Sequence, residues 1–210
     1  MGLKKLDKLK VITHLAALTP LVYLIVNVFQ NHLGADPIRE IMRRTGRDAL
    51  VLLVITLAVG PVRNIFGLVR VGRLRRTIGL YTFLYVSVHF LTFAGLDFRF
   101  NFNLIKEGVL EKPFALVGFS AFLLLIPLAI TSTNGWVRRL GKNWKRLHRV
   151  IYLVAALDIL HFLWQAKAKA LRKEPLIYGA IIIFLILLRL PAVKKRVSKI
   201  GSLGTGPNED

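Results

Sequence analysis

The chain contains no cysteine. This absence excludes disulfide bonds, thiolate metal sites, iron–sulfur clusters and the Cys-x-x-Cys-His attachment of c-type haem. Methionine is scarce, with 2 in 210 residues, and acidic residues are few, with 11 Asp and Glu against 31 Lys and Arg. Any bound metal or prosthetic group must therefore be held by histidine, by carboxylate or carbonyl oxygens, or by a rare methionine.

The residues that are present make the chain both very apolar and very basic. Hydrophobic residues are 54% of the sequence, and the formal net charge is +20. Such a charge would suit a nucleic-acid-binding protein, but that class spreads its basic residues over a soluble surface. Here the charges lie in short clusters between uncharged apolar runs. We therefore expect membrane lipid, and no nucleic acid, as the partner of these clusters.

Six apolar segments can be drawn, each close to the ~17–25 residues that a helix needs to cross a bilayer. They cover residues 11–29, 49–66, 77–96, 114–132, 149–166 and 176–193. The runs are continuous rather than alternating, and lipid permits only helices or closed barrels as spanning structures. The sequence predicts an all-α integral membrane protein, a bundle of six transmembrane helices.

The basic residues are divided unequally between the two sets of alternate connections. Most of the 31 Lys and Arg lie before the first segment, between the second and third, between the fourth and fifth, and after the sixth. By the positive-inside rule this set faces the cytoplasm, so both termini are expected there. Arg189 lies near the inner end of the sixth segment, where it could snorkel to the surface.

The same pattern predicts three parts in the chain. They are a basic cytoplasmic N-terminus at 1–10, the transmembrane domain at 11–196, and a disordered, Gly-rich cytoplasmic tail at 197–210. The first apolar segment follows lysines as a signal peptide would, but it continues past Pro20 without a small-residue cleavage site, so we expect a retained anchor. No internal repeat is obvious.

Two histidines lie deep inside apolar segments, where an ionisable side chain is costly and marks a functional candidate. If the third and fifth segments begin at Thr77 and Arg149, His89 and His161 both lie about 18 Å from the cytoplasmic surface. Two imidazoles at one height on different helices suit bis-histidine ligation of haem b. Alternatively, each imidazole forms a hydrogen bond with a neighbouring helix. Aromatic candidates for the walls of a haem site are Phe83, Phe90, Phe93, Phe162 and Trp164.

His14 and His148 share a second level near the cytoplasmic surface and are candidates for a second haem site. His148 and His161 lie about 140° apart around an ideal helix. Either the fifth helix is irregular, or His148 belongs to the preceding loop, or the two histidines serve different neighbours. Asp158, one turn before His161, either orients that imidazole or reaches the outer interface. His32, in an outer connection, is expected to be solvated.

Several stretches resemble the ferric-reductase-like transmembrane family and, within it, the haem-binding membrane subunits of periplasmic methionine sulfoxide reductase systems. They cover most of the chain, and the part from His148 to Trp164 is the most specific. The stretches are HLAALTPL at 14–21, LGADP at 33–37, TGR at 45–47, RRTIGL at 75–80 before His89, AITST at 129–133, and RLGKNWKRLHRVIY at 139–152 with HFLW at 161–164.

The resemblance implies that His89, His148 and His161 occupy haem-ligand positions. It implies that electrons from a cytoplasmic flavin reductase, or from the quinone pool, pass through haem b to a periplasmic molybdopterin enzyme that reduces methionine sulfoxide. The location implied is the bacterial inner membrane. The family is also associated with FMN, for which the sequence offers no recognisable site. Larger relatives carry a fused FAD and NADPH domain that 210 residues cannot contain, so we expect a separate donor and no substrate chemistry in this subunit.

Three other functions are compatible with the same residues. A free-standing ferric reductase would deliver electrons to metal at the outer surface without a protein partner. A small transporter or proton conductor would use the histidines as relays and would bind no haem. A structural assembly subunit would tolerate the loss of both His89 and His161.

Overall fold

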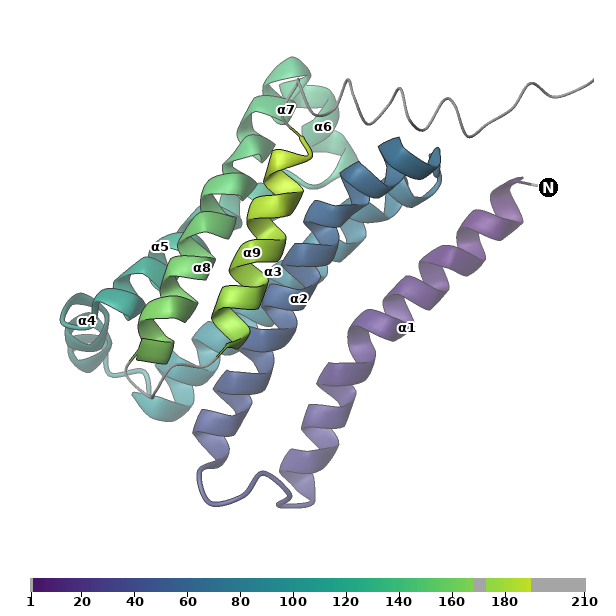
Figure 1. The fold of residues 1–210 in the computed structure, drawn as a ribbon. Coiled ribbons are helices and arrows are strands. Elements are labelled where there is room, and N and C mark those ends of the chain that lie inside the picture. Colours follow the sequence, from purple (N-terminus) through teal and green to yellow (C-terminus); the bar gives the residue numbers. More distant parts are fainter. Residues whose placement is uncertain (1, 168–172, 190–210) are drawn as a thin grey trace, which may run out of the picture.

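The structure, a computed structural model, describes residues 2–167 and 173–189, with side chains placed for 8–165 and 173–189. The regular secondary structure of these residues is entirely helical (Figure 1). The longest helices are α1 (Gly2–Phe29), α2 (Pro37–Phe66), α3 (Arg75–Leu91), α5 (Pro113–Ile130), α8 (Ile151–Lys167) and α9 (Glu174–Leu187).

Five helical stretches among the described residues are long and apolar enough to cross a membrane. They are Lys8–Phe29, Pro37–Phe66, Val71–Asp97, Pro113–Ile130 and Lys142–Gln165. The prediction of an all-α membrane protein is confirmed. The sixth predicted span corresponds to α9, whose 14 residues reach about 21 Å, less than a hydrocarbon core of ~30 Å. Residues 190–193 of that predicted span lie outside the described residues.

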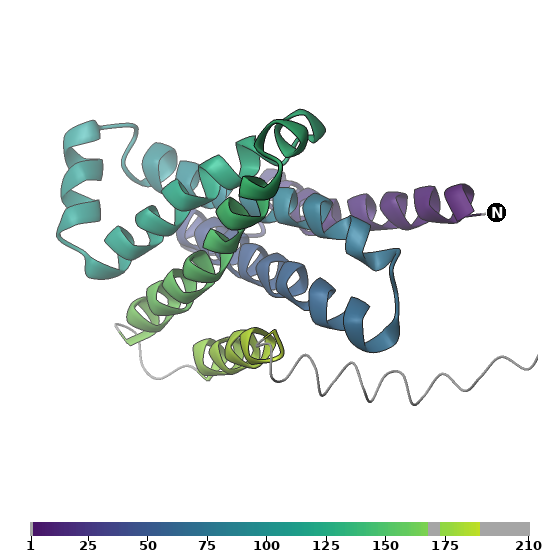
Figure 2. The same ribbon diagram turned by 90° about the horizontal axis from the view of Figure 1, so that it is seen from above.

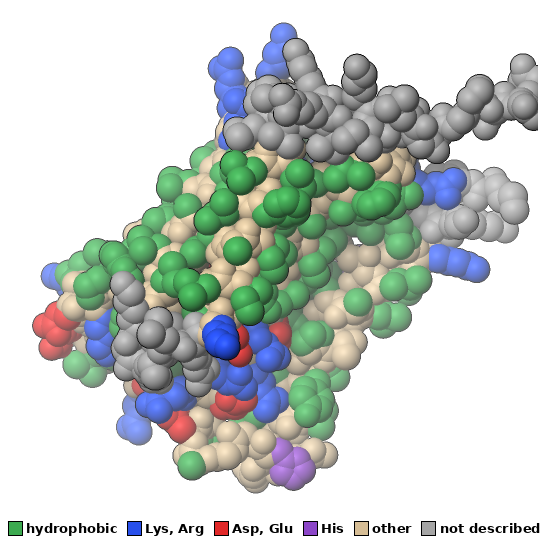
Figure 3. Space-filling model, viewed as in Figure 1, with side chains coloured by type: hydrophobic (Ala, Val, Ile, Leu, Met, Phe, Trp, Pro, Cys, Tyr) green, Lys and Arg blue, Asp and Glu red, His purple; other side chains and the backbone are tan. Residues whose placement is uncertain are grey.

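Large apolar side chains are displayed on the outside of the bundle. Phe29 is 82% exposed and Phe102 is 81% exposed. Figure 3 shows hydrophobic side chains over the middle of the molecule, while the charged side chains visible in this view gather at its two ends. A belt of this kind suits contact with lipid, because apolar side chains that face lipid are not exposed to water.

The connections between helices alternate between two ends of the molecule, as the hydropathy pattern predicts. The start of α1, the turn between α2 and α3, and the short helices α6 (Asn134–Leu140) and α7 (Lys142–Leu147) lie at one end (Figure 1). The α1–α2 connection and α4 (Phe102–Leu110) lie at the other. That the first end faces the cytoplasm stays a prediction of the positive-inside rule.

The start of α2 differs from the prediction. The helix begins at Pro37, whereas hydropathy places its start at residue 49. The side chain of Asp36 caps the first turn by accepting the backbone N–H of Arg39, and proline is preorganised for this first position. The hydropathy pattern did not predict this start, because the first turns of α2 are charged and were interpreted as a connection between helices. Pairs such as Glu40 with Arg44, four residues apart, stabilise a helix.

Several short helical elements connect the long helices and were not predicted. The side chain of Asn101 caps α4, and that of Thr133 caps α6. Gly141 separates α6 from α7 with φ of 50° and ψ of −119°, a backbone conformation that suits glycine because it has no Cβ. The remaining elements are η1 (Val71–Leu74), η2 (Thr92–Asp97), which is a π-helix, and η3 (His148–Val150).

Two helix pairs form the centre of the bundle. α2 packs most extensively on α3, and α5 packs most extensively on α8. The pairs meet through α3 and α5, and α9 packs on both α2 and α8. One buried cluster joins the four elements α2, α5, α8 and α9, with Leu57, Leu125, Val154 and Ile182 at its centre. In the view from above, α1 extends away from this bundle (Figure 2).

Arg189 turns into the protein, so the expectation that it snorkels to the surface was wrong. Its Nη1 donates to the hydroxyl of Tyr152 at 2.5 Å, and its Nη2 donates to the carbonyl of Leu57. That carbonyl lacks its usual helical donor because Pro61, four residues later, has no N–H. Gly60 leaves room, since a Cβ there would lie 2.9 Å from Nη2. Arg189 thus ties the end of α9 to α2 and α8.

Candidate functional site

The structure brings the imidazoles of His89 and His161 together between the two helix pairs. His89 lies near the end of α3 and His161 lies in the second half of α8. Their ring centroids are 6.3 Å apart, and the ring planes are nearly perpendicular, at 85°. The equal depth inferred from the sequence therefore corresponds to a real juxtaposition of the two rings.

Each imidazole is fixed by one hydrogen bond to a backbone carbonyl of its partner helix. Nδ1–H of His89 donates to the carbonyl of Met42 in α2 at 2.9 Å. Nδ1–H of His161 donates to the carbonyl of Phe114 in α5 at 2.7 Å. A carbonyl only accepts, so Nδ1 carries the proton in both rings, and in the neutral form of each ring Nε2 keeps its lone pair. Two neutral imidazoles with free Nε2 atoms are potential metal ligands.

The separation of the rings fits a metal held between them. A bond between a metal and an imidazole nitrogen is about 2 Å long, and the half-width of each ring adds about 1 Å, so two ligands on opposite sides of one metal have centroids about 6 Å apart. The observed 6.3 Å agrees. Among the described residues, no group of three or more His, Cys, Asp or Glu could hold a metal ion. The donor set therefore fits a metal that already has other ligands, as in a porphyrin.

Phenylalanine rings line the interface between α3 and α5. Phe90 stacks on Phe122 at 4.8 Å between centroids and lies 5.6 Å from Phe119. Phe83 stacks on Phe122 at 6.0 Å. Phe83 and Phe90, which were expected as walls of a haem site, pack here against α5, and Phe93 lies 6.4 Å from Phe90. Phe119 and Phe122 were not expected, because nothing in the sequence pairs α5 with α3. Phe162, like Phe83, is partly buried and packs against the main buried cluster.

Two further expectations near His161 can be compared with the structure. Trp164 is 38% exposed, which favours a place on the outer surface of the bundle over one on the wall of a haem site. Asp158 makes no hydrogen bond to His161 in the described residues, where the carbonyl of Phe114 fixes the ring instead. Orientation of His161 by Asp158 is therefore not observed.

His14 and His148 contact different neighbours in the structure. His14 lies on the surface of α1, and a hydrogen bond of 2.7 Å joins its Nδ1 to the hydroxyl of Tyr81. His148 shares a hydrogen bond of 3.1 Å between its Nε2 and Oγ1 of Thr131, and its ring stacks on Trp144 at 4.0 Å. A second haem level at these two residues stays a prediction.

The angular mismatch between His148 and His161 has a simple structural origin. The chain is not one continuous α-helix between them: α7 ends at Leu147, η3 contains His148, and α8 begins at Ile151. Of the alternatives that the sequence left open, the helix is irregular, and the two histidines also contact different neighbours. His32 is exposed beyond the end of α1, as expected.

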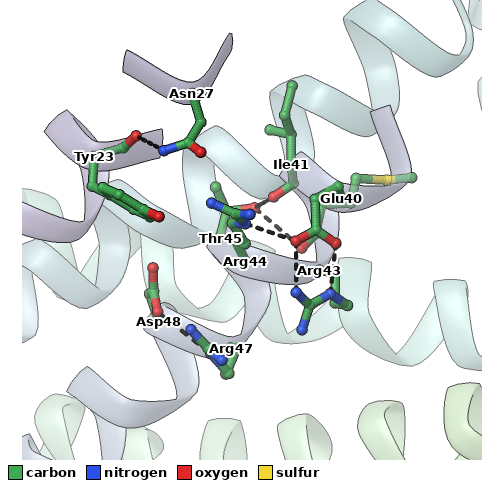
Figure 4. A network of polar contacts seen from close by, with 10 residues as sticks. Tyr23, Asn27, Glu40, Ile41, Arg43, Arg44, Thr45, Arg47 and Asp48 are labelled. Carbon is green, nitrogen blue, oxygen red and sulfur yellow. Dashed lines mark hydrogen bonds and ion pairs between the residues drawn. The ribbon is translucent and has the colours of Figure 1, made fainter. Parts of the chain in front are cut away.

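A network of ion pairs fixes the end of α2 that holds His89. The carboxylate of Glu40 accepts two hydrogen bonds from Arg43, at 2.6 and 2.7 Å, and one from Arg44 at 2.7 Å. The guanidinium of Arg44 also lies over the ring of Tyr23 in α1, 5.7 Å from its centroid (Figure 4). Met42 lies within this turn, so the network orders the carbonyl that holds His89.

Comparison with known proteins shows the family to which the chain belongs. Residues 45–159 match the family described as ferric reductase like transmembrane component. The chain is 44% identical over 200 residues to the protein-methionine-sulfoxide reductase heme-binding subunit MsrQ of Herminiimonas arsenicoxydans, covering 95% of this chain and 92% of that protein. This chain belongs to the ferric-reductase-like transmembrane family and, within it, to the MsrQ group.

Other MsrQ proteins give the same picture. The chain is 46% identical over 183 residues to the MsrQ heme-binding subunit of Xanthomonas axonopodis pv. citri (strain 306), covering 84% of this chain and 83% of the relative. It is 41% identical over 186 residues to that of Caulobacter vibrioides (strain ATCC 19089 / CIP 103742 / CB 15), covering 88% of each. The membership in a transmembrane family and the five apolar spans together make the chain a multi-pass membrane protein.

Proposed function

We propose that this member of the MsrQ group carries electrons across the bacterial inner membrane through haem b that His89 and His161 ligate. The observation that carries the proposal is the pair of imidazoles 6.3 Å apart, both with Nδ1 engaged and Nε2 available. When bound, haem supplies a one-electron couple between ferric and ferrous iron. The protein would supply Nε2 of His89, Nε2 of His161 and an apolar surrounding that excludes water.

The acceptor in this proposal is a periplasmic molybdopterin-containing methionine sulfoxide reductase. Relatives 41–49% identical to this chain are named as heme-binding subunits of protein-methionine-sulfoxide reductase, which supports this assignment. The donor is a cytoplasmic flavin reductase or the quinone pool, and FMN is the flavin implied. The role is repair of oxidised periplasmic proteins, in which this subunit makes and breaks no substrate bond.

His148 and His14 are proposed as ligands of a second, cytoplasmic haem. Both lie toward the end of the bundle where electrons would enter, and the ring of His148 stacks on Trp144 and shares a hydrogen bond with Thr131. Because the two histidines bind different neighbours, the second haem would require His14 to leave Tyr81. We therefore expect a lower haem occupancy at His14 and His148 than at His89 and His161.

Absorption spectra of the detergent-purified protein, oxidised and dithionite-reduced, test the proposal. We expect low-spin b-type bands in the wild type and loss of most of that absorbance in His89→Ala and in His161→Ala, because iron loses an axial ligand. His148→Ala should remove at most the second haem, and His32→Ala is the matched control with an unchanged spectrum. A wild type without a Soret band would support a transporter, and an unaltered spectrum in His89→Ala or His161→Ala would exclude these ligands.

A second measurement separates an electron carrier from a free-standing ferric reductase. The reduced protein is mixed either with a ferric chelate or with the oxidised periplasmic reductase. We expect rapid reoxidation by the reductase and slow reoxidation by the chelate. The reverse order would favour the ferric reductase.

A further inference from the structure

The contacts that hold the two imidazoles occur twice along the chain with one constant spacing. In the first set, the carbonyl of Met42 accepts from His89, and Gly46 lies against the same ring. In the second set, Phe114, Gly118 and His161 make the same contacts. Each member of the second set lies 72 residues after its counterpart (114 − 42, 118 − 46 and 161 − 89).

The repeat extends into the packing of the helices. Ala49 and Leu53 are buried in α2, and their counterparts at the same spacing, Ala121 and Leu125, are buried in α5. These residues lie on the two most extensively packed helix pairs, α2 with α3 and α5 with α8. The two helix pairs therefore hold their imidazoles through corresponding residues at one constant spacing, which was not obvious from the sequence.

We infer that Gly46 and Gly118 are positioning residues, each of which sets the orientation of one haem ligand. The inference rests on the proposed function. Without a Cβ at these two positions, each imidazole can bring its Nδ1 edge close to the neighbouring helix. Its Nδ1–H then reaches the carbonyl one turn earlier, which still has a second lone pair. This hydrogen bond directs Nε2 away from the helix and toward the opposite ring.

The space available to a Cβ distinguishes these glycines from an ordinary small residue in a helix interface. At Gly118 a Cβ would lie 2.6 Å from Nδ1 of His161, and at Gly46 it would lie 3.2 Å from both Cε1 and Nδ1 of His89. At Gly79, a third glycine in the same bundle, the nearest atom is Cγ2 of Thr56 at 3.7 Å, an ordinary contact. Gly79 is therefore the matched control.

The distances at Gly118 and Gly46 also predict which alanine substitution disturbs its imidazole more. A separation of 2.6 Å cannot be tolerated, so Gly118→Ala must displace the ring of His161 and weaken the hydrogen bond to Phe114. A separation of 3.2 Å requires a shift of only a few tenths of an ångström, so Gly46→Ala should retain His89 as a ligand in a slightly altered position. The expected order of effects is Gly118→Ala, then Gly46→Ala, then Gly79→Ala.

The experiment compares the purified Gly118→Ala, Gly46→Ala and Gly79→Ala variants with the wild type. The rate of haem transfer to apomyoglobin measures retention, and a redox titration measures the midpoint potential. In Gly118→Ala we expect haem affinity to fall by about tenfold or more. The potential should rise, because an imidazole with a weaker Nδ1–H hydrogen bond is less basic and stabilises ferric iron less. Gly79→Ala should match the wild type.

A double variant covers the case in which Gly118→Ala does not yield monodisperse protein. Gly118→Ala/His161→Ala removes the ring that the new Cβ meets, so it should be as monodisperse as His161→Ala alone. Continued aggregation of the double variant, or wild-type retention and potential in Gly118→Ala, overturns the inference. If His89→Ala and His161→Ala leave the spectrum unaltered, the proposed function fails. If those two lose haem but the glycine variants behave like Gly79→Ala, only this inference fails.

Discussion

His89 and His161 each depend on a single hydrogen bond to a backbone carbonyl. In an apolar interior such a bond contributes more than it would in water, and a buried partner left without it costs about 1–3 kcal/mol. The bond also selects the tautomer with the proton on Nδ1, which makes Nε2 the only available ligand atom. The orientation of both rings is therefore set by the protein.

The angle between the two imidazole planes leads to a spectroscopic prediction. The two ring planes are 85° apart, so with haem bound the two imidazoles would interact with different d orbitals of the iron and leave these orbitals close in energy. We expect the ferric protein to give a highly anisotropic low-spin signal, with one dominant low-field feature, in electron paramagnetic resonance at liquid-helium temperature. A rhombic signal with three resolved features, typical of parallel imidazoles, would contradict the observed arrangement of the rings.

The sequence predicted that His89 and His161 lie close together, but it did not predict the hydrogen bonds that orient their rings. The depth of His89 and His161 follows from counting residues along two helices. The carbonyls of Met42 and Phe114, by contrast, are backbone atoms that every residue carries. No residue type marks such an acceptor, so it becomes visible only when the neighbouring helix is placed beside the imidazole.

Among the elements, α9 shows how one polar contact can fix a short apolar helix. It has 14 residues and packs on α2 and α8. Its end is held by Arg189, which replaces the donor that Pro61 lacks at the carbonyl of Leu57. Proline is tolerated within a membrane helix when a neighbour satisfies the carbonyl it frees.

Replacement of Arg189 should therefore destabilise the bundle in a way that depends on Pro61. Arg189→Leu leaves the carbonyl of Leu57 without a donor, and we expect a loss of about 1–3 kcal/mol. Pro61→Ala restores an N–H to this turn of α2, so the double variant should lose less than Arg189→Leu alone. Chemical denaturation of the detergent-purified variants measures the loss.

The control for this pair is Arg138→Leu, which removes an exposed arginine of α6 and should change stability little. Equal losses in Arg189→Leu with and without Pro61→Ala would mean that Arg189 does not act through the carbonyl of Leu57.

The sequence predicted the long elements better than the short ones. Continuous apolar runs determine the central parts of α1, α2, α3, α5 and α8, because only a helix satisfies backbone groups in lipid. The short helices α4, α6 and α7 could have been recognised in part from capping residues such as Asn101 and Thr133. The start of α2 was missed because its first turns are charged and are stabilised by pairs with Glu40.

The whole molecule is organised by the separation of apolar sides from charged ends (Figure 3). Acidic residues are few, and the basic clusters lie at the ends of the helices. This arrangement gives the bundle a defined depth in the membrane. Its orientation depends on which end carries more basic residues, since transfer of Lys and Arg across the membrane is disfavoured.

The natural absence of cysteine makes this orientation directly measurable. Single cysteines at His32, Asn103, Lys8 and Lys142, which are all exposed, would be the sole thiols of the chain. In spheroplasts, a membrane-impermeant maleimide should label His32→Cys and Asn103→Cys at once. Lys8→Cys and Lys142→Cys should react only after lysis. The opposite pattern would reverse the predicted topology.

The sequence by itself determined that the chain is helical, lies in a membrane and carries two histidines at equal depth. These properties follow from hydrophobicity, charge and the rise per residue, which act along the chain. The tertiary structure decided which helices pair, that a carbonyl and a glycine support each imidazole, and that Arg189 turns inward to Leu57. Those contacts join residues 43 to 132 positions apart. Their geometry depends on how the helices pack against one another, and hydropathy along the chain does not contain that information.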